Sequence, residues 1–510
     1  MSASSILHVE NDAKTLRNKA YTISLPLLMG GLAISIGAFI LFYIHWDRGY
    51  LWLDETFSLW AADPSRSLWD MQAQMLANET NPPLHFWLLH GVRRIVEEPR
   101  LAGHALNFAV AVLALSGIIG LPWRARRPRL GLMLGIVFLM SASTMSFMQD
   151  IRSGLLAMSL CGVSTALSGT VRLKGQADRL EMILAGTLGA LTGISHVYGA
   201  LFTGCLAAAL VGEAALMRNR SEGIFGLVLG GACSLTFAGW FASLWISTGG
   251  QLGSIAWLAT LPPLLGFDLV WRSYFGPVWA WYVMGAGFLF ALAAAPFRRS
   301  AAILLACAAM VVGSIALISL KMPIVFFRYF LILAPPFHLL LALAVYDLIA
   351  RYRETDRPNG LATLVLLGGC VALFLPVATG VSDAAFLVPK QDPWWSGIDR
   401  VKAEAARCPS HTIRVNLTDA PELRDGKVFG FNYLLRQTGL RIEDAAPPAK
   451  DVSEIDCSVV GWAEHMPKSG AGTMPGAPSE ADALKLMNLT NARHIPLKIE
   501  RHFFGFVIYK

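Results

Sequence analysis

Apolar runs of about twenty residues recur along the first three quarters of this chain and limit what it can fold into. A helix of that length crosses the ~30 Å hydrocarbon core of a bilayer. We predict about eleven such helices, near residues 22–44, 101–121, 131–148, 152–171, 180–195, 197–217, 223–246, 277–295, 301–320, 328–349 and 360–380. The runs therefore predict an α-helical polytopic membrane protein.

The composition supports a membrane protein. Of the 510 residues, 55% are hydrophobic and only 15% are charged, whereas a soluble protein of this length needs much more polar surface. The formal net charge of +7 comes from basic residues in turns that flank the apolar runs. They form no extended patch, so the charge indicates membrane topology and does not indicate a nucleic-acid partner.

The basic clusters also predict the orientation. They precede the first apolar run and then follow alternate runs, at Lys14–Lys19, 124–129, 172–179, 218–220, 298–299 and 351–357. By the positive-inside rule, the N-terminus is cytoplasmic. The long first loop, residues 45–100, and the polar tail then lie outside. We expect a multi-pass protein of the plasma (inner) membrane, without a cleaved signal peptide.

Two domains are expected. Residues 1–380 form the membrane domain, and residues 381–510 form a small extracytoplasmic α/β domain. Its strand-like runs are 411–417, "CSVVGW" and "FFGFVIYK", and residues 430–438 look helical. Cys408 and Cys457 both fall in this domain, where a disulfide is possible in an oxidising compartment. The spacing leaves a disulfide and two free thiols equally open.

The first external loop contains amphipathic helices. Asp63 followed by Pro64 is a good helix start, and apolar residues at helical spacing predict a helix over 64–78 lying along the outer surface. Before it stands "YLWLDETFSLW", in which Asp54 and Glu55 are adjacent acids among tryptophans and leucines. Two neighbouring carboxylates in such surroundings are costly, so we interpret them as functional.

Other polar residues stand at the ends of apolar runs, where they too are costly and hence candidates for function. The predicted topology places four separated pairs on the outer side: Asp54 with Glu55, Asp150 with Arg152, His196 with Tyr198, and Lys321 with Arg328. A carboxylate can take a proton from an acceptor hydroxyl, and arginine and lysine can stabilise a departing phosphate. Together these groups favour glycosyl transfer from a lipid-phosphate sugar.

Five motifs carry a family resemblance: "WLDETFSLW", "NPPLHFWLLH", "MQDIRSGLLAMSL", "ISHVYGALF" and "FRYFLILAPP". In this order, over residues 20–350, they resemble the integral-membrane glycosyltransferases of the GT-C type. Within that type, the motifs are most similar to those of the protein O-mannosyltransferase and lipid A aminoarabinose transferase superfamily. The resemblance implies polyprenyl-phosphate sugar donors.

The resemblance also assigns residues. It implies that Asp54 is catalytic, and it assigns substrate contacts to Asp150, Arg152, Arg328 and Tyr329. Glu55, His196, Tyr198 and Lys321 are expected to contact substrate as well, because of their position at the outer ends of the apolar runs. Some members of the family bind a divalent metal, for which Glu55 or His196 would be ligands here; the cofactor stays unknown. Asn81 departs from the pattern, because the family commonly has histidine before "PPL". Ser153 and Gly154 stand where an aromatic residue is common.

We therefore predict a glycosyltransferase, hexosyl or pentosyl, whose acceptor is an envelope glycolipid, a polysaccharide or a protein. Two alternatives remain open: a transporter or flippase for a lipid-linked or anionic substrate, and a polymerase or ligase of diphosphate-linked glycans. A transporter is expected to show internal repeats, which we do not find in the sequence. His85 and His90 lie in an apolar stretch, and we interpret them as structural or interfacial.

Overall fold

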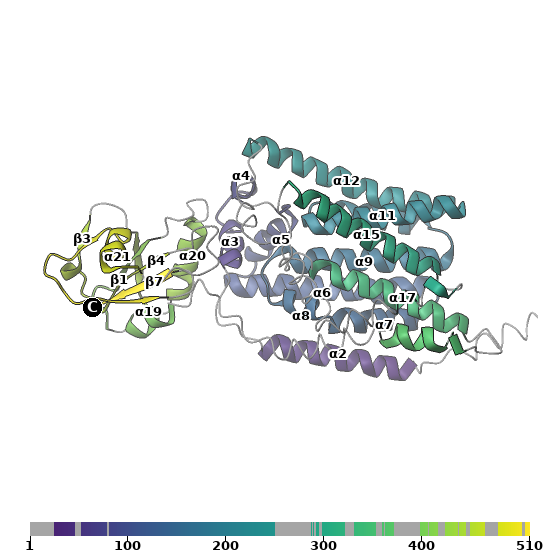
Figure 1. Ribbon diagram of the computed structural model, residues 1–510, viewed down its shortest axis with the longest axis horizontal. Coiled ribbons are helices and arrows are strands. Elements are labelled where there is room, and N and C mark those ends of the chain that lie inside the picture. Colours follow the sequence, from purple (N-terminus) through teal and green to yellow (C-terminus); the bar gives the residue numbers. More distant parts are fainter. Residues whose placement is uncertain are drawn as a thin grey trace, which may run out of the picture.

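The computed structural model describes most of the chain in two parts, a helical bundle and a smaller sheet-containing part beyond one end of it (Figure 1). The described residues are 25–45, 53–78, 81–249, 287, 289, 292–294, 298–321, 331–352, 360–361, 363–371, 398–405, 407–416, 424–436, 438–444, 449–464, 478–501 and 505–510. The proposed domain boundary at residue 380 lies outside them.

Within these ranges, five helices are long and apolar enough to cross a membrane. They are α6 (Pro99–Arg124), α9 (Ser153–Lys174), α11 (Val197–Met217), α12 (Arg220–Thr248) and α15 (Arg298–Ser319). Three helices contain shorter apolar segments: α2 (Leu25–His45), α7 (Pro128–Met140) and α17 (Ala334–Tyr352). With α10 (Arg179–Gly193), they match nine of the predicted spans in position, and the chain is a multi-pass membrane protein.

Four spans differ from the prediction or are only partly described. The expected span 131–148 is two helices, α7 and α8 (Ala142–Met148), because Ser141 between them is extended at φ −67° and ψ 129°. The span 328–349 is described only from a short 3₁₀ turn, η2 (Leu331–Leu333), that leads into α17. Most of the predicted span 277–295 lies outside the described residues, as does the end of 360–380.

Ion pairs join the helices at the end of the bundle that holds the basic clusters. Arg124 at the end of α6 pairs with Asp178 at 2.7 Å, and Lys174 at the end of α9 pairs with Glu181 at 2.8 Å. Arg299 at the start of α15 pairs with Glu213 near the end of α11. The basic ends of these helices thus meet on one side, as the alternation of clusters predicts.

The opposite end carries three short helices: α3 (Leu53–Ala61), α4 (Leu68–Asn78) and α5 (Leu84–Arg93). The predicted helix over 64–78 begins four residues late. Its N-terminus is capped by Ser67, whose Oγ accepts from the Asp70 N–H at 3.1 Å. Asp63, the expected cap, instead accepts from the Ser65 N–H at 2.9 Å. This side-chain turn competes with helix formation, which is why the helix starts after it.

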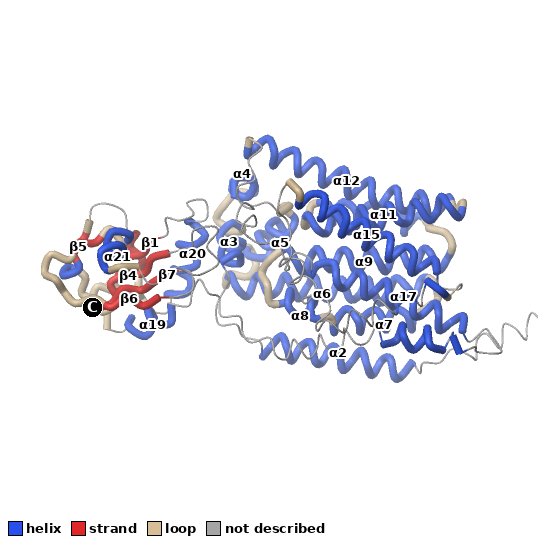
Figure 2. The backbone as a smooth tube through the Cα atoms, in the orientation of Figure 1, coloured by secondary structure: helices blue, strands red, loops and turns tan. Residues whose placement is uncertain are grey.

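The second part is α/β, as predicted. Its five-stranded sheet has the order β2-β1-β4-β7-β6, in which β1 is parallel to β2 and β4, and β7 is antiparallel to β4 and β6. Figure 2 shows these strands in red. They are β1 (Thr412–Asn416), β2 (Arg441–Asp444), β4 (Val459–Glu464), β6 (Lys498–Arg501) and β7 (Gly505–Tyr509).

Short elements complete this part. β3 (Lys450–Asp451) pairs with β5 (Leu489–Thr490), and the short 3₁₀ turn η5 (Val452–Glu454) follows β3. The helices are α19 (Ile398–Ala405), α20 (Arg424–Leu435) and α21 (Glu480–Leu486). The expected helical segment 430–438 is the second half of α20 and the turn after it. Most of residues 466–479 lie outside the described residues.

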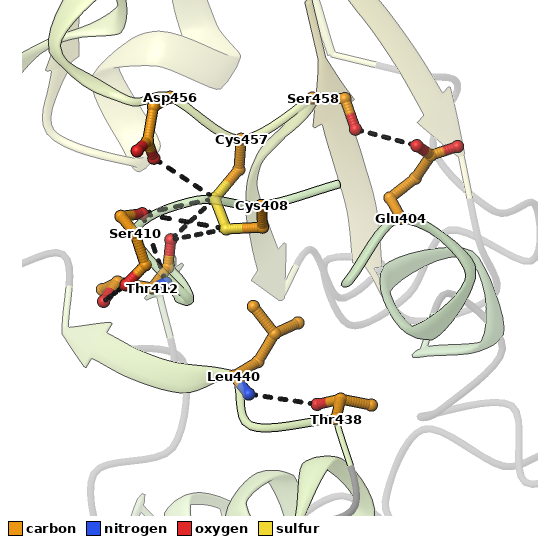
Figure 3. Close-up of a disulfide and its surroundings, with 9 residues drawn as sticks. All are labelled: Glu404, Cys408, Ser410, Thr412, Thr438, Leu440, Asp456, Cys457 and Ser458. Atoms are coloured by element: carbon orange, nitrogen blue, oxygen red, sulfur yellow. Dashed lines mark hydrogen bonds between the residues drawn. A yellow bond between two sulfur atoms is a disulfide. The ribbon is translucent and has the colours of Figure 1, made fainter. Parts of the chain in front are cut away.

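A disulfide joins Cys408 to Cys457 across a sequence separation of 49 residues (Figure 3). The two cysteines precede β1 and β4, neighbouring parallel strands, and their Cα atoms lie 4.3 Å apart. Of the two alternatives that the sequence left open, the structure therefore has the disulfide. Disulfides of this kind form and persist in oxidising compartments.

Candidate active site

The two adjacent acids occupy the first turn of α3. Unpaired N–H groups and the helix dipole stabilise negative charge at this position. The Ser58 hydroxyl donates to the Asp54 carbonyl oxygen one turn earlier, at 2.9 Å. Glu55 is buried, whereas Asp54 is partly exposed. The acids are thus unequal: Glu55 is buried in the protein, and Asp54 keeps part of its surface exposed.

Glu55 connects α3 to the turn between α8 and α9. Its Oε1 accepts from the Ile151 backbone N–H at 2.9 Å. Within this turn the Arg152 N–H donates to the Asp150 carbonyl oxygen at 2.8 Å. The "DE" and "DIR" motifs, about a hundred residues apart, therefore meet.

Two further contacts hold this turn in place from α6. The Asn107 side-chain amide donates to the Met148 carbonyl oxygen at 3.1 Å and to the Asp150 carbonyl oxygen at 2.8 Å. Gly103 lies one turn earlier on α6, and an added Cβ there would collide with the Ile151 side chain. Glycine thus allows the turn to approach α6 closely. Asp150 is buried beside it.

Arg152 extends from this turn to α3. One guanidinium nitrogen, Nη1, lies 3.4 Å from the Asp54 carbonyl oxygen and 3.2 Å from the Ser58 hydroxyl oxygen. The side chain is partly exposed, so it combines a contact to α3 with access to the outside. A fixed cation next to a carboxylate-bearing helix turn is suited to bind a phosphate group close to Asp54.

His85, in the first turn of α5, also contacts the turn before α9, a neighbour that the sequence analysis did not predict. It is buried and adjoins the Ile151 backbone and the Arg152 charge, and its Nε2 has no hydrogen-bond partner among the described residues. Burial, with the nearby Arg152 charge, lowers the pKa of His85 to about 3. The imidazole is therefore neutral at physiological pH. In the sequence, only the position of His85 directly after "NPPL" could have suggested this contact.

The same helix reaches the segment that contains His196 and Tyr198. The Leu84 N–H donates to the Ile194 carbonyl oxygen at 3.0 Å. His196 is the N-cap of α11, where its Nδ1 accepts from the Tyr198 N–H at 3.1 Å. Both side chains are buried, with ring centroids 5.9 Å apart. Three of the four predicted segments are thus linked through α3, α5 and the turn before α9.

The fourth segment is only partly described. Lys321 is exposed just after α15. Because Arg299 fixes the start of α15 at the basic end of the bundle, Lys321 lies at the opposite end, on the side of Asp54. Arg328 and Tyr329 lie outside the described residues.

The possible metal ligands do not form a site among the residues that the structure describes. The one cluster there with three ligating side chains within 4.8 Å is Cys408, Asp456 and Cys457, and its two cysteines are joined in the disulfide. Glu55 and His196 belong to no such cluster within the described ranges, and each already accepts a backbone hydrogen bond. Within the described part of the chain, Glu55 and His196 are therefore not grouped with a third metal-ligating side chain.

The bundle and the sheet-containing part together have the fold of the GT-C type integral-membrane glycosyltransferases. One similar structure is ArnT from Cupriavidus metallidurans bound to undecaprenyl phosphate, with a TM-score of 0.52 and 12% identity over 95% of this chain and 98% of that chain. The apo state of that ArnT gives a TM-score of 0.54 and 13% identity over 96% and 98%.

A weaker likeness joins this chain to the oligosaccharyltransferase AglB from Archaeoglobus fulgidus in complex with an inhibitory peptide and a dolichol-phosphate. Its TM-score is 0.45, with 10% identity over 82% of this chain and 64% of that chain. No family model matches the sequence. No curated protein matches it either.

Proposed function

We propose that this protein transfers a sugar from a polyprenyl-phosphate donor to an acceptor hydroxyl at the outer face of the plasma (inner) membrane. The fold likeness to ArnT, which extends over nearly the whole of both chains, supports this proposal. The observation that carries it is the contact between Arg152 and the Asp54 turn of α3. It places a cation beside the helix turn that carries Asp54, at one end of an apolar bundle.

The proposed chemistry uses Asp54 as the general base. Its carboxylate takes the proton of the acceptor hydroxyl, and the hydroxyl oxygen forms a bond to the anomeric carbon of the sugar. The bond between that carbon and the phosphate oxygen breaks, and the polyprenyl phosphate leaves with the electron pair. Arg152 stabilises the charge that develops on the phosphate. General-base catalysis of this kind contributes about 10²- to 10⁴-fold to a rate.

The other candidate residues have supporting roles in this proposal. Lys321, Arg328 and Tyr329 bind the donor phosphate and sugar together with Arg152. His196 and Tyr198 shape the substrate site from the start of α11. Glu55 and Asp150 are buried, so we assign them to holding α3 and the turn before α9 in register.

Topology and partners follow from the same proposal. The N-terminus is cytoplasmic and the C-terminal part is extracytoplasmic, so the acceptor is a glycolipid, a glycan or a protein that reaches the outer leaflet. The donor is a polyprenyl-phosphate hexose or pentose. The fold likeness favours the transferase over the transporter or flippase.

The Asp54→Asn variant tests the proposal, because the amide keeps the shape of the side chain but cannot accept the proton. Asp399→Asn is a matched control, since Asp399 also lies in the first turn of a helix but is exposed in the C-terminal part. Envelope glycolipids and glycans are compared by mass spectrometry between cells that lack the gene and cells complemented with each variant.

We expect the glycan that disappears with the gene to return with wild type and Asp399→Asn. With Asp54→Asn, its rate of formation should fall at least about 100-fold at an equal membrane level of protein. Full product with Asp54→Asn would reject Asp54 as the base. A gene deletion that changes no glycan while altering lipid or anion transport would support the transporter instead.

A further inference from the structure

Helix α20 of the C-terminal part lies directly against α3, the helix that carries Asp54 (Figure 1). Phe429 of α20 packs on an apolar cluster made by α3, α4 and α5. The cluster consists of Phe57, Trp60, Ala61, Met71, Met75 and Phe86. The Phe57 ring centroid is 5.5 Å from that of Trp60 and 6.4 Å from that of Phe86. One aromatic side chain of α20 thus reaches the packing that locates α3.

A second contact joins α20 to the start of α6. The Tyr433 hydroxyl donates to Glu98 Oε1 at 2.6 Å, and Arg436 lies 3.7 Å from the same oxygen. Burial and the bond to Glu98 raise the pKa of Tyr433 to about 12, so the phenol stays a donor at neutral pH. Glu98 is itself the N-cap of α6 and accepts from the Leu101 N–H. The contact therefore ends on the cap of a membrane-spanning helix.

Arg93 connects these two contacts. It is buried at the end of α5, where it donates to the Leu59 carbonyl oxygen in the last turn of α3. A cation at this position also interacts favourably with the helix dipole. The Arg93 guanidinium carbon lies 6.0 Å from the Phe429 ring centroid. The C-terminal end of α3 is therefore fixed by Arg93 next to the point where α20 packs.

These contacts affect the position of Asp54 on α3 relative to Arg152 in the turn before α9. α3 carries Asp54, while α6 holds the turn that carries Arg152 through the bonds of Asn107. α20 touches both elements, α3 through Phe429 and α6 through Glu98. A helix of nine residues such as α3 is not stable in isolation, so its packing contacts determine where Asp54 lies.

We propose that α20 positions the catalytic carboxylate, with Phe429 and Tyr433 as positioning residues that fix α3 relative to the turn before α9. The catalytic role of Asp54 in this inference rests on the proposed function. The geometric part, which is the positioning of α3 by α20, rests on the contacts alone. The C-terminal part then contributes to turnover without contacting the reacting atoms. Small displacements of reacting groups are costly: about 1 Å can reduce a rate 100-fold.

Hydrogen–deuterium exchange on the full chain in nanodiscs tests the geometric part. The variants are Phe429→Leu, which removes the ring, and Tyr433→Phe, which removes only the hydroxyl. Asn432→Ala is the matched control, because Asn432 is an exposed residue of α20 between the two. We expect at least about threefold faster exchange in peptides 53–61 and 149–153 with Phe429→Leu and Tyr433→Phe. The Asn432→Ala variant should match wild type.

The peptide 149–153 is informative because it reports on the Ile151 N–H, which donates to Glu55 on α3. A loss of folding in the C-terminal part is recognised separately, since it would also speed exchange in β1 and β4. Unchanged exchange at 53–61 and 149–153 in Tyr433→Phe and Phe429→Leu would overturn the inference. Faster exchange throughout the C-terminal part in both variants would overturn it as well, because the residues would then only stabilise that part.

Turnover supplies the second measurement. We expect Phe429→Leu to lower glycan formation about tenfold and Tyr433→Phe by less, while binding of undecaprenyl phosphate to the purified protein stays within about twofold. Equal losses of binding and turnover would contradict positioning. If Asp54→Asn keeps full product while exchange changes as expected, the proposed function fails and the contact geometry stands. If Asp54→Asn is inactive and the α20 variants are wild type in both measurements, this inference alone fails.

Discussion

The two ends of the helical bundle both gather charged residues, but they use them differently. At the basic end, charged side chains pair with one another, as in Arg124 with Asp178 at 2.7 Å and Lys174 with Glu181 at 2.8 Å. At the other end, Glu55 accepts from a backbone N–H, and Arg152 donates to a carbonyl and a hydroxyl oxygen. Glu55 and Arg152 thus each link α3 to the turn before α9.

This difference separates a structural cluster from a candidate site. Ion pairs such as Arg124 with Asp178 are partly exposed, and pairs of this kind contribute little to stability. A partly exposed cation that contacts neutral oxygens, as Arg152 does, can still attract an incoming phosphate. Arg152 thus contacts α3 through neutral oxygens, whereas Arg124 and Lys174 contact carboxylates.

The largest expected effect comes from replacing one arginine at each end of the bundle by alanine and comparing the two variants. Arg152→Ala removes the contacts to α3 and the proposed phosphate contact, so we expect glycan formation to fall about 100-fold and binding of undecaprenyl phosphate to weaken. Arg124→Ala removes the ion pairs of Arg124 with Asp178 and Glu181, but Lys174 still pairs with both carboxylates, so glycan formation and binding should stay unchanged. Mass spectrometry and binding to the purified protein measure these effects. Equal losses in the two variants would remove the distinction between the ends.

The sequence predicted the meeting of Asp54 with Arg152, because the positive-inside bias placed both at the same end of the bundle. It did not predict that Glu55, and not Asp54, would be the buried member of the pair. Burial on a short helix depends on which neighbour packs against it, and here that neighbour is the Ile151 turn, 96 residues away. Such contacts leave no periodic signal in the sequence.

The fold was predicted more completely than the site for the same reason. Apolar length determines where α6, α9 and α12 run, and alternation determined β1 and β7. His85 was interpreted as structural because its surroundings in the sequence are apolar. Its approach to Ile151 and Arg152 depends on how α5 packs, which the hydrophobic pattern does not contain. The α20 contact was not predicted because it joins segments more than 300 residues apart in the sequence.

A smaller effect is expected from Glu55. Glu55→Ala leaves the buried Ile151 N–H without its acceptor, at a cost of about 1–3 kcal/mol, and should lower the apparent melting temperature in detergent. Glu55→Gln keeps an oxygen in place and should retain most of the stability. Differential scanning fluorimetry compares the two. A melting temperature for Glu55→Gln as low as that of Glu55→Ala would show that the charge of Glu55, rather than its hydrogen bond, stabilises this end.

The smallest effect concerns pH. Because the pKa of His85 is lowered to about 3 in the folded protein and is about 6.5 when unfolded, the unfolded state binds the extra proton between these values. Stability is then fully present above pH 6.5 and falls as the pH drops toward 3, by about 1 kcal/mol between pH 7.5 and 5.5. His85→Gln should reduce the change of the melting temperature with pH in this range. His494→Gln, at an exposed position, should leave that change as in wild type. The same slope in both variants would mean that the pKa of His85 does not differ between the folded and the unfolded protein, and would contradict this prediction.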